Sequence, residues 1–273
     1  MDNRYFLTED QLAVQELARQ FADDVVSKTV TELDQNHAFP MEEIKQCSEM
    51  GFLGVCVPEE YGGGGMDHLS DILVMEQIAR HSSSLASIID AHSSLGSMPL
   101  VLAGSEEQKR NYLTPAARGE KLCAFALTEP QSGSDAAQIK TTAVLDGDEW
   151  VINGSKAFIT NSTYAGIFLV AVKTDLAAKG SRGISVILVP NDVPGLEIDK
   201  PEEKMSNRSS FSCPLAFTDV RVPKENLVGE LNRGFPLFMK CVDDGRIAIS
   251  AVAVGMAQGV LERATKYSKE HVL

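Results

Sequence analysis

The first 120 residues carry the spacing of hydrophobic positions that is typical of α-helices. Thr8-Glu9-Asp10-Gln11 has the pattern of a capping box, in which a Thr begins a helix and a Gln follows three positions later. Apolar residues then recur at roughly helical spacing, and they are Leu12, Leu17, Ala18, Phe21 and Val25. A second helix is predicted between Pro40 and Gly51, because Pro favours the first turn of a helix and Gly its end.

Further helices are predicted in the same part of the chain. Residues 70–80 have helical spacing, residues 84–103 form a long apolar helix, and Ser105–Gln108 repeats the capping-box pattern. Before them, Tyr61–Gly65 contains four consecutive glycines and predicts a loop, because glycine loses too much backbone entropy inside a helix or strand. We interpret this loop as a flexible connector, with a phosphate-cradling loop as the alternative.

Between residues 121 and 227 the pattern changes to short β-rich runs. The predicted strands are Cys123–Leu127, Thr141–Leu145, Glu149–Ile152, Phe168–Val172, Ile184–Val189 and Leu215–Phe217. The turn signals between them are Asp146-Gly147-Asp148, Asn153-Gly154, Lys179-Gly180 and Val193-Pro194-Gly195. Helices followed by strands predict an α+β fold, with an N-terminal helical domain over residues 1–120 and a middle β-barrel or β-sandwich domain over residues 121–230.

Residues 235–270 predict one long apolar helix that begins a C-terminal helical domain over residues 231–273. The small side chains in it permit close contact with another helix, and they include Ala248, Ala251, Ala253 and Ala257. No later helix follows to cover its apolar face. We therefore expect a C-terminal domain that is truncated, or one that another chain completes.

The composition narrows the class of protein. The net charge is −13 and no dense Lys/Arg run occurs, which argues against a nucleic-acid partner. The five cysteines and five histidines show neither C-x-x-C nor H-x-x-x-H spacing, so we predict no metal site. The N-terminus lacks an apolar signal core, and no uninterrupted apolar run approaches the ~18 residues of a membrane span. These features predict a cytoplasmic protein without a membrane span.

Three segments combine turn residues with side chains that suit ligand binding. Phe125–Asp135 ends a strand in hydroxyl and glycine residues that suit an anionic ligand, and a structural loop explains them equally well. Gly154–Asn161 gathers aromatic, aliphatic and hydroxyl side chains that suit a planar ring, with a plain hairpin strand as the alternative. Asp243–Arg246 forms either a surface ion pair or a buried pair that touches a substrate.

Taken in order, these segments resemble the acyl-CoA dehydrogenase family. The matching motifs are Thr128-Glu129-Pro130 with Gly133-Ser134-Asp135, Asn153-Gly154 with Lys156 and Phe158-Ile159-Thr160-Asn161, and Phe217–Pro223. Val57–Gly63 is similar to the family's P-E-E-Y-G-G, and Asp244–Ile249 and Gly255–Gly259 continue the match. The resemblance covers nearly the whole chain, and its Gly-Arg-Ile segment is similar to the short-chain and butyryl-type members.

The resemblance implies an FAD cofactor held between the middle domain and the C-terminal bundle. The residues implied in FAD binding are Phe125, Leu127, Thr128, Gly133, Ser134, Phe158, Ile159 and Thr160. In this interpretation Thr128 meets the ring edge, Thr160 hydrogen-bonds near flavin N5, and Phe158 replaces the Trp that most members have. The residues implied in acyl-CoA binding are Ser134, Asp243, Gly245 and Arg246.

The implied reaction is the α,β-desaturation of an acyl-CoA thioester in fatty-acid β-oxidation, with electrons passed to an electron-transfer flavoprotein. The family is usually tetrameric, so we expect a homo-oligomer, a tetramer or a dimer. A carboxylate removes the α-proton, and most members place it beyond the equivalent of Leu273. A minority place it at the position of Gly245, which cannot act as a base, so no catalytic residue is assigned. The alternatives are an acyl-CoA oxidase-like flavoprotein and a non-catalytic remnant that binds flavin or acyl-CoA.

Overall fold

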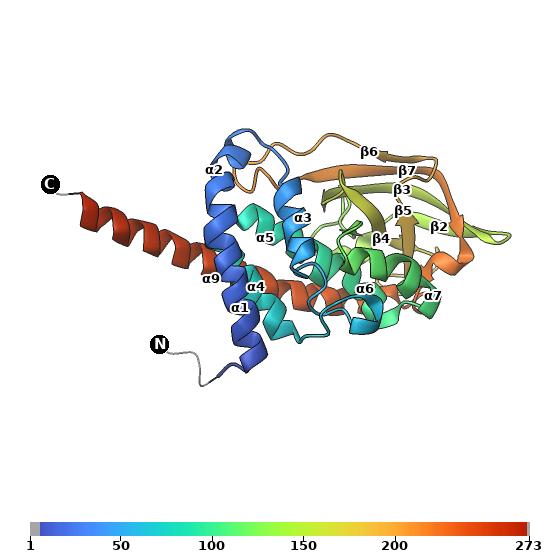
Figure 1. Ribbon diagram of the computed structural model, residues 1–273. Coiled ribbons are helices and arrows are strands. Elements are labelled where there is room, and N and C mark those ends of the chain that lie inside the picture. Colours follow the sequence, from blue (N-terminus) through green and yellow to red (C-terminus); the bar gives the residue numbers. More distant parts are fainter. Residues whose placement is uncertain (1–5, 272–273) are drawn as a thin grey trace.

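The computed structural model describes residues 6–271 and places the N-terminal helices beside a β-sheet (Figure 1). These helices are α1 (Glu9–Phe21), α2 (Ser27–Gln35), α3 (Met41–Glu49), α4 (His68–Ala79), α5 (Ser83–Asp90), α6 (Met98–Ala103), α7 (Glu106–Gln108) and α8 (Thr114–Ala117). Both predicted capping boxes form, one at Thr8 and one at Ser105. Pro40 and Gly51 bracket α3, and Gly51 has a φ of 77°. The helical prediction for this part of the chain is confirmed.

The long apolar helix predicted over residues 84–103 is present, but it is not a uniform α-helix. The π-helical segment η4 (Ala91–Ser97) joins α5 to α6. The other short π and 3-10 segments are η2 (Ala22–Val26), η3 (Glu59–Tyr61), η5 (Lys109–Leu113), η6 (Ala136–Gln138) and η7 (Lys224–Asn226). A π segment widens the helical turn, and such segments are frequent at functional sites.

The strands of the middle region form one mixed sheet. They are β1 (Leu122–Ala126), β2 (Thr142–Asp146), β3 (Glu149–Thr160), β4 (Ala165–Lys173), β5 (Ile184–Pro190), β6 (Leu196–Ile198), β7 (Ser212–Pro223) and β8 (Leu227–Val228). The order along the sheet is β6-β7-β3-β2-β4-β5-β8, and β1 runs parallel to β4. All six predicted strands are present, and the predicted turn at Asp146-Gly147-Asp148 connects β2 to β3.

The sequence predicts a turn at Asn153-Gly154, and this prediction is wrong. Both residues lie inside β3, where the pairing with β7 shifts register between Ile152 and Gly154. The Asn153 side chain donates to Asp219 Oδ1 at 3.0 Å and accepts from Asp219 N at 2.9 Å. A Cβ on Gly154 would lie 2.6 Å from the Thr141 backbone, so the glycine permits a close approach of two chains. The pair therefore marks a β-bulge, which has the same residue preferences as a turn.

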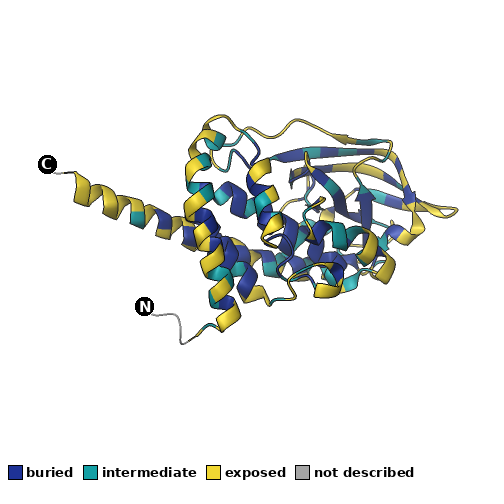
Figure 2. Ribbon diagram, in the orientation of Figure 1, coloured by how far each residue is buried: buried dark blue, intermediate teal, exposed yellow. Residues whose placement is uncertain are grey.

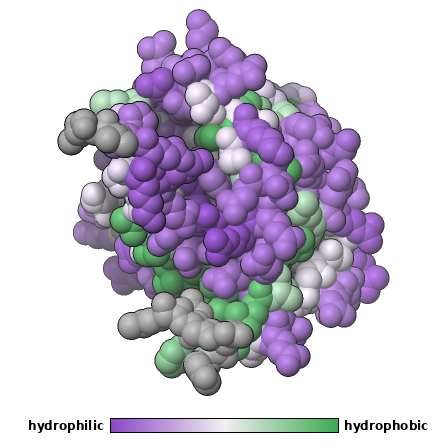
Figure 3. All heavy atoms as spheres, turned by 60° about the vertical axis from the view of Figure 1, so that its left-hand side comes forward, coloured by the Kyte–Doolittle hydropathy of each residue, from purple (hydrophilic) through white to green (hydrophobic). Residues whose placement is uncertain are grey.

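The helix α9 (Gly234–Glu270) runs below the sheet, crosses α4 and then projects from the rest of the molecule (Figure 1). Where α9 crosses α4, a Cβ on Gly255 would lie 2.1 Å from Glu76 O, and one on Gly259 would lie 1.9 Å from Arg80 O. The projecting end is exposed (Figure 2). The large apolar side chains exposed on α9 include Ile247, Ile249, Val254, Met256, Val260 and Leu261. Seen from the side toward which α9 projects, most of the surface is hydrophilic, with apolar strips between (Figure 3).

Two helical stretches have the length and apolar composition of a membrane span. They are Ser83–Ala103 and Gly234–Glu270. The first is mostly buried inside the protein, as expected of a core helix, whereas the second is mostly exposed. Both stretches mix apolar with small polar side chains, so their mean composition is apolar although neither contains an unbroken apolar run of that length.

Candidate functional site

A pocket of about 260 Å³ opens where η4, the end of β1, the second half of β3 and α9 meet. Its lining residues are Ala91, Leu95, Phe125, Leu127, Thr128, Phe158, Ile159, Thr160 and Val242. Six of the eight residues that the sequence implicates in FAD binding are therefore gathered at one place. They come from two segments that β2 separates in the chain, so only the fold brings them together.

The backbone holds these two wall segments side by side. Ala157 N donates to Thr128 O at 2.9 Å, which places β3 next to the segment that follows β1. The pairing of β3 with β7 shifts register again between Lys156 and Ile159. Phe158 lies in this second bulge with a φ of 58°, and it is 64% exposed. A positive φ is strained for an aromatic residue, so the bulge uses backbone strain to present the ring at the pocket.

Aromatic and aliphatic side chains make up most of the pocket wall. The ring of Phe125 packs on that of Phe238 in α9, with the centroids 4.1 Å apart. Polar groups come from Thr128 and from Thr160, whose Oγ1 lies 3.1 Å from Ser212 Oγ on β7. An apolar pocket with a few hydroxyl groups at its edge suits a planar ring system that carries polar atoms on its rim.

Two buried side chains tie the helical side of the pocket to the strands. Asn161 Nδ2, just after β3, donates to Ile88 O in α5 at 2.9 Å. Cys123 N in β1 donates to Nδ1 of His92 in η4 at 2.9 Å. Because Nδ1 accepts this bond, His92 is neutral with its proton on Nε2. Burial lowers the pKa of His92 to about 4, so the ring stays neutral across the physiological range.

A buried ion pair lies behind the strand wall, and neither of its partners is among the residues predicted to bind a ligand. Lys156 Nζ lies 2.8 Å from Glu129 Oε1, and both residues are buried. Burial lowers the pKa of Lys156 to about 8. Burial alone would raise the pKa of Glu129, but the Lys156 ammonium and several N–H donors lower it. Both residues stand inside the motifs that carry the family resemblance, which is the signal that could have identified them.

The remaining predicted ligands lie outside the pocket. Gly133 and Ser134 are exposed on the loop after Glu129, and a Cβ on Gly133 would meet no atom within 4 Å. Asp243 and Arg246 form an exposed ion pair on α9, with Arg246 Nη1 3.2 Å from Asp243 Oδ1. Gly245 is buried, and it faces Leu95 in the pocket wall.

Two buried carboxyl groups lie behind the helical wall. Asp90 immediately precedes the pocket residue Ala91, and burial raises its pKa to about 6. Burial and the charge of Asp90 raise the pKa of Asp71 to about 7. Ser93 Oγ donates to Asp71 Oδ2 at 3.4 Å.

Within residues 6–271, no group of three His, Cys, Asp or Glu side chains is arranged to hold a metal ion, and the five cysteines are free thiols.

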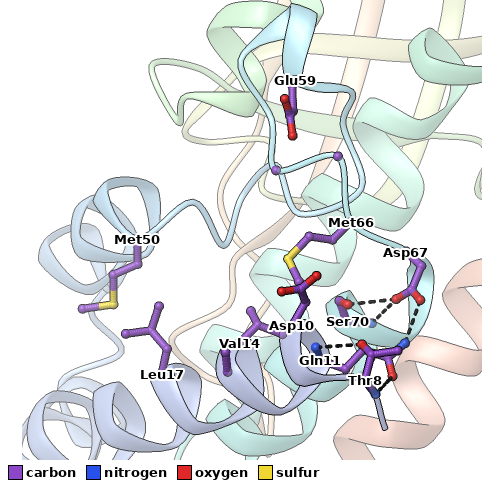
Figure 4. Close-up of a pocket in the computed structure, with 13 residues that line it drawn as sticks. Thr8, Asp10, Gln11, Val14, Leu17, Met50, Glu59, Met66, Asp67 and Ser70 are labelled. Carbon is purple, nitrogen blue, oxygen red and sulfur yellow. Dashed lines mark hydrogen bonds between the residues drawn. The ribbon is translucent and has the colours of Figure 1, made fainter.

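A second, larger hollow of about 690 Å³ contains none of the predicted site residues (Figure 4). It lies between α1, the end of α3, the glycine loop and the start of α4, and the loop contributes Gly64 and Gly65. Asp67 at its edge accepts from Gln11 Nε2 at 2.7 Å and from Ser70 N at 2.9 Å. Hydrogen bonds from the Ser70 backbone and side chain lower the pKa of Asp67. The backbone N–H groups of Gly64 and Gly65 donate to Gly54 O and Val57 O, both at 2.9 Å, so they are not available to a phosphate. The loop links α3 to α4, but these bonds hold it in place, and its flexibility stays a prediction.

Comparisons with known proteins place this geometry in a family. Family models for the N-terminal, middle and C-terminal domains of acyl-CoA dehydrogenase match residues 8–120, 124–220 and 232–272. The short-chain specific acyl-CoA dehydrogenase of Clostridium acetobutylicum is 42% identical over 97% of this chain and 69% of its own length. The chain belongs to the acyl-CoA dehydrogenase family. The resemblance seen in the sequence motifs and the α+β fold class are therefore confirmed.

Solved structures agree with this membership. A chain in the structure reported for the electron transferring flavoprotein of Acidaminococcus fermentans, in work on flavin-based electron bifurcation, is 42% identical. It matches with a TM-score of 0.96 over 100% of this chain and 71% of that one. A glutaryl-CoA dehydrogenase from Mycobacterium smegmatis, solved in complex with FADH2, is 30% identical and matches with a TM-score of 0.92 over 100% of this chain and 68% of that one. The cofactor in this relative is the one expected from the sequence.

The pocket meets the chemical requirements of a flavin ring. Its apolar wall matches the hydrocarbon faces of the ring, and two threonines supply hydrogen-bonding groups for the heteroatoms at the ring edge. The strained backbone at Phe158 is a second indication, because strain of this kind persists at ligand sites where the surrounding structure enforces it. The residues present therefore fit FAD.

Proposed function

We propose that this protein is an FAD-dependent acyl-CoA dehydrogenase that desaturates a short-chain acyl-CoA thioester and passes the electrons to an electron-transfer flavoprotein. The observation that carries the proposal is the meeting of the Phe125–Thr128 and Phe158–Thr160 segments in one apolar pocket beside α9. The family membership of the chain supports the reaction class.

The proposed roles follow from the place of each side chain. Phe125, Leu127 and Ile159 offer apolar contact to the flavin ring, and Phe158 covers its exposed side. Thr128 and Thr160 hydrogen-bond its edge. Gly133 and Ser134, which lie outside the pocket, serve the pyrophosphate end of the cofactor. When bound, FAD supplies the acceptor for the hydride that leaves the β-carbon.

The acyl-CoA thioester is proposed to lie against the helical wall. Leu95 and Val242 give this wall its apolar character, and Gly245 removes a side chain from it. The exposed Asp243 and Arg246 are available to the CoA portion. No lining residue in the described part of the chain is a carboxylate, so the proposal assigns no base.

The proposed partners are an electron-transfer flavoprotein and further copies of the same chain. The relative found in the structure of an electron transferring flavoprotein supports the first partner. A cytoplasmic location and a homotetramer are the expectations that accompany the proposal.

The test is an anaerobic titration of the FAD-loaded protein with acyl-CoA thioesters of increasing chain length. The expected result is loss of flavin absorbance near 450 nm with the short thioesters. No bleaching with any thioester would contradict the proposal. Air is then admitted after reduction with dithionite: slow reoxidation fits a dehydrogenase, whereas reoxidation within seconds would indicate an acyl-CoA oxidase.

A further inference from the structure

We propose that the buried Lys156–Glu129 ion pair positions the two strand walls of the FAD pocket relative to each other. This inference rests on the proposed function of the pocket. Lys156 stands two residues before Phe158, and Glu129 follows Thr128 directly. Neither side chain lines the pocket itself, so the pair acts through the pocket residues that flank it in the chain.

The ammonium group of Lys156 connects β3 to the segment after β1. Its Nζ donates to Glu129 Oε1 at 2.8 Å and to Leu127 O at 3.1 Å. Leu127 is a pocket residue, so this second bond fixes a peptide plane in the wall directly. Together with the bond from Ala157 N to Thr128 O, it clamps the two walls at adjacent positions.

The carboxylate of Glu129 also accepts hydrogen bonds from a third segment. Its oxygens accept from Lys140 N at 2.6 Å, from Thr141 N at 3.0 Å and from Gln131 Nε2 at 2.6 Å. Lys140 and Thr141 lead into β2, which pairs with β3. One carboxylate therefore fixes the loop that carries Thr128, the start of β2 and, through Lys156, the bulged part of β3.

Single and double replacements of a buried ion pair can distinguish a positioning role from a role in stability alone. Removing one partner leaves an uncompensated buried charge and destabilises the fold, whereas replacing both partners with neutral side chains of similar size is often neutral for stability. A pair whose only role is stability is therefore replaceable, but a pair that positions a ligand site is not. When both charges are removed together, the hydrogen bond to Leu127 O and those from two backbone N–H groups to Glu129 are still lost or weakened.

The experiment compares Glu129→Gln, Lys156→Met and the double variant with the wild type. Each protein is titrated with FAD by flavin fluorescence, its flavin absorbance and visible CD spectra are recorded, and its thermal unfolding is followed without FAD. The matched control is Arg221→Met, which removes an exposed ion pair with Asp146 and Glu149 on the same sheet, away from the pocket.

We expect the single variants to lose thermal stability and the double variant to recover part of it. We expect the double variant nevertheless to bind FAD about tenfold more weakly with a shifted flavin spectrum, which is the cost of one misplaced buried hydrogen bond. The control should match the wild type. A double variant with wild-type affinity and spectrum would overturn the positioning role while leaving the proposed function intact. Should the wild type itself bind no FAD, the proposed function fails and this inference with it.

Discussion

Gly245 of α9 faces Leu95 of η4 so closely that a Cβ on the glycine would lie 2.9 Å from Leu95 Cδ2. Leu95 lines the pocket. Because residue 245 has no side chain, α9 can approach the helical wall of the pocket closely. The same small residue rules out a carboxylate at the one position within the chain where the family resemblance would have put a base.

The first prediction compares Gly245→Ala with Gly259→Ala, both inside α9. The methyl group at 245 meets the end of a flexible leucine, which can rotate into the pocket. The methyl group at 259 meets the carbonyl of Arg80 at 1.9 Å, which cannot move alone. Alanine also gains ~1 kcal/mol of helix propensity over glycine in each case. Urea unfolding should show Gly245→Ala within ~1 kcal/mol of the wild type and Gly259→Ala destabilised by ~2 kcal/mol. Equal effects at the two sites would contradict this account of the α9 contacts.

The second prediction concerns the strained residue Phe158. Its ring is largely exposed and its φ is positive, so Phe158→Gly relieves strain and loses little packing. Phe158→Ala keeps the strain and loses the ring. We expect the glycine variant to be more stable than the alanine variant by ~1 kcal/mol in denaturant unfolding, while both bind FAD more weakly than the wild type. If alanine proved the more stable of the two, the backbone at residue 158 would not be strained.

The third prediction is a pH dependence that originates at His92. The folded protein keeps this histidine neutral down to a pKa of about 4, whereas the unfolded chain takes up a proton near the ordinary value of ~6.5. The stabilising contribution is complete above pH 6.5 and is lost as pH falls toward 4, at up to ~1.4 kcal/mol per pH unit. The His92→Asn variant keeps an acceptor for Cys123 N but does not titrate. When the pH is lowered from 7.5 to 5, the wild type should lose ~2 kcal/mol of unfolding free energy relative to the variant. A difference that is independent of pH would show that His92 is not held neutral.

The fourth prediction has the opposite sign and concerns Asp71. The folded protein keeps a proton on this carboxyl up to a pKa of about 7, whereas the unfolded chain loses it near ~3.9. The folded state therefore binds more protons between these values, and stability is lost as pH rises toward 7. Asp71→Asn removes this titration. Relative to the wild type, the variant should become more stable by at least ~1 kcal/mol on going from pH 5 to pH 7.5. Asp10→Asn, on the exposed first turn of α1, is the matched control for the loss of a carboxylate. A wild type and Asp71→Asn variant whose stability difference does not change with pH would contradict the prediction.

Local features of the chain were predictable from sequence because local interactions determine them. The capping boxes at Thr8 and Ser105 need only four residues each, and the glycine at residue 51 ends α3 through its own backbone. The failure at Asn153-Gly154 has a physical reason. The residues that favour a turn also favour a β-bulge, and the partner that decides between them, Asp219, is distant in the chain.

The candidate site was predictable only through its ordered motifs. Phe125 to Thr128 and Phe158 to Thr160 were singled out as segments, but their meeting in one pocket depends on the order of strands in the sheet. The ordered motifs contain both Lys156 and Glu129, but the contact between them is not predictable, because a long-range contact leaves no periodic trace in the sequence. The π-helical turn at η4 was missed for a related reason, since the apolar pattern of residues 84–103 does not distinguish it from an α-helix.

The central claim is that FAD binds in the pocket lined by Leu127, Phe158 and Ile159. The most direct measurement is a flavin fluorescence titration of the wild type and of Thr128→Trp, whose indole would occupy the strand side of the pocket, where the proposal places the flavin. Far-UV CD of both proteins verifies that the fold is retained. The account predicts saturation at one FAD per chain for the wild type and a large loss of affinity for the variant. Equal FAD binding by both folded proteins would place the cofactor elsewhere and contradict the account.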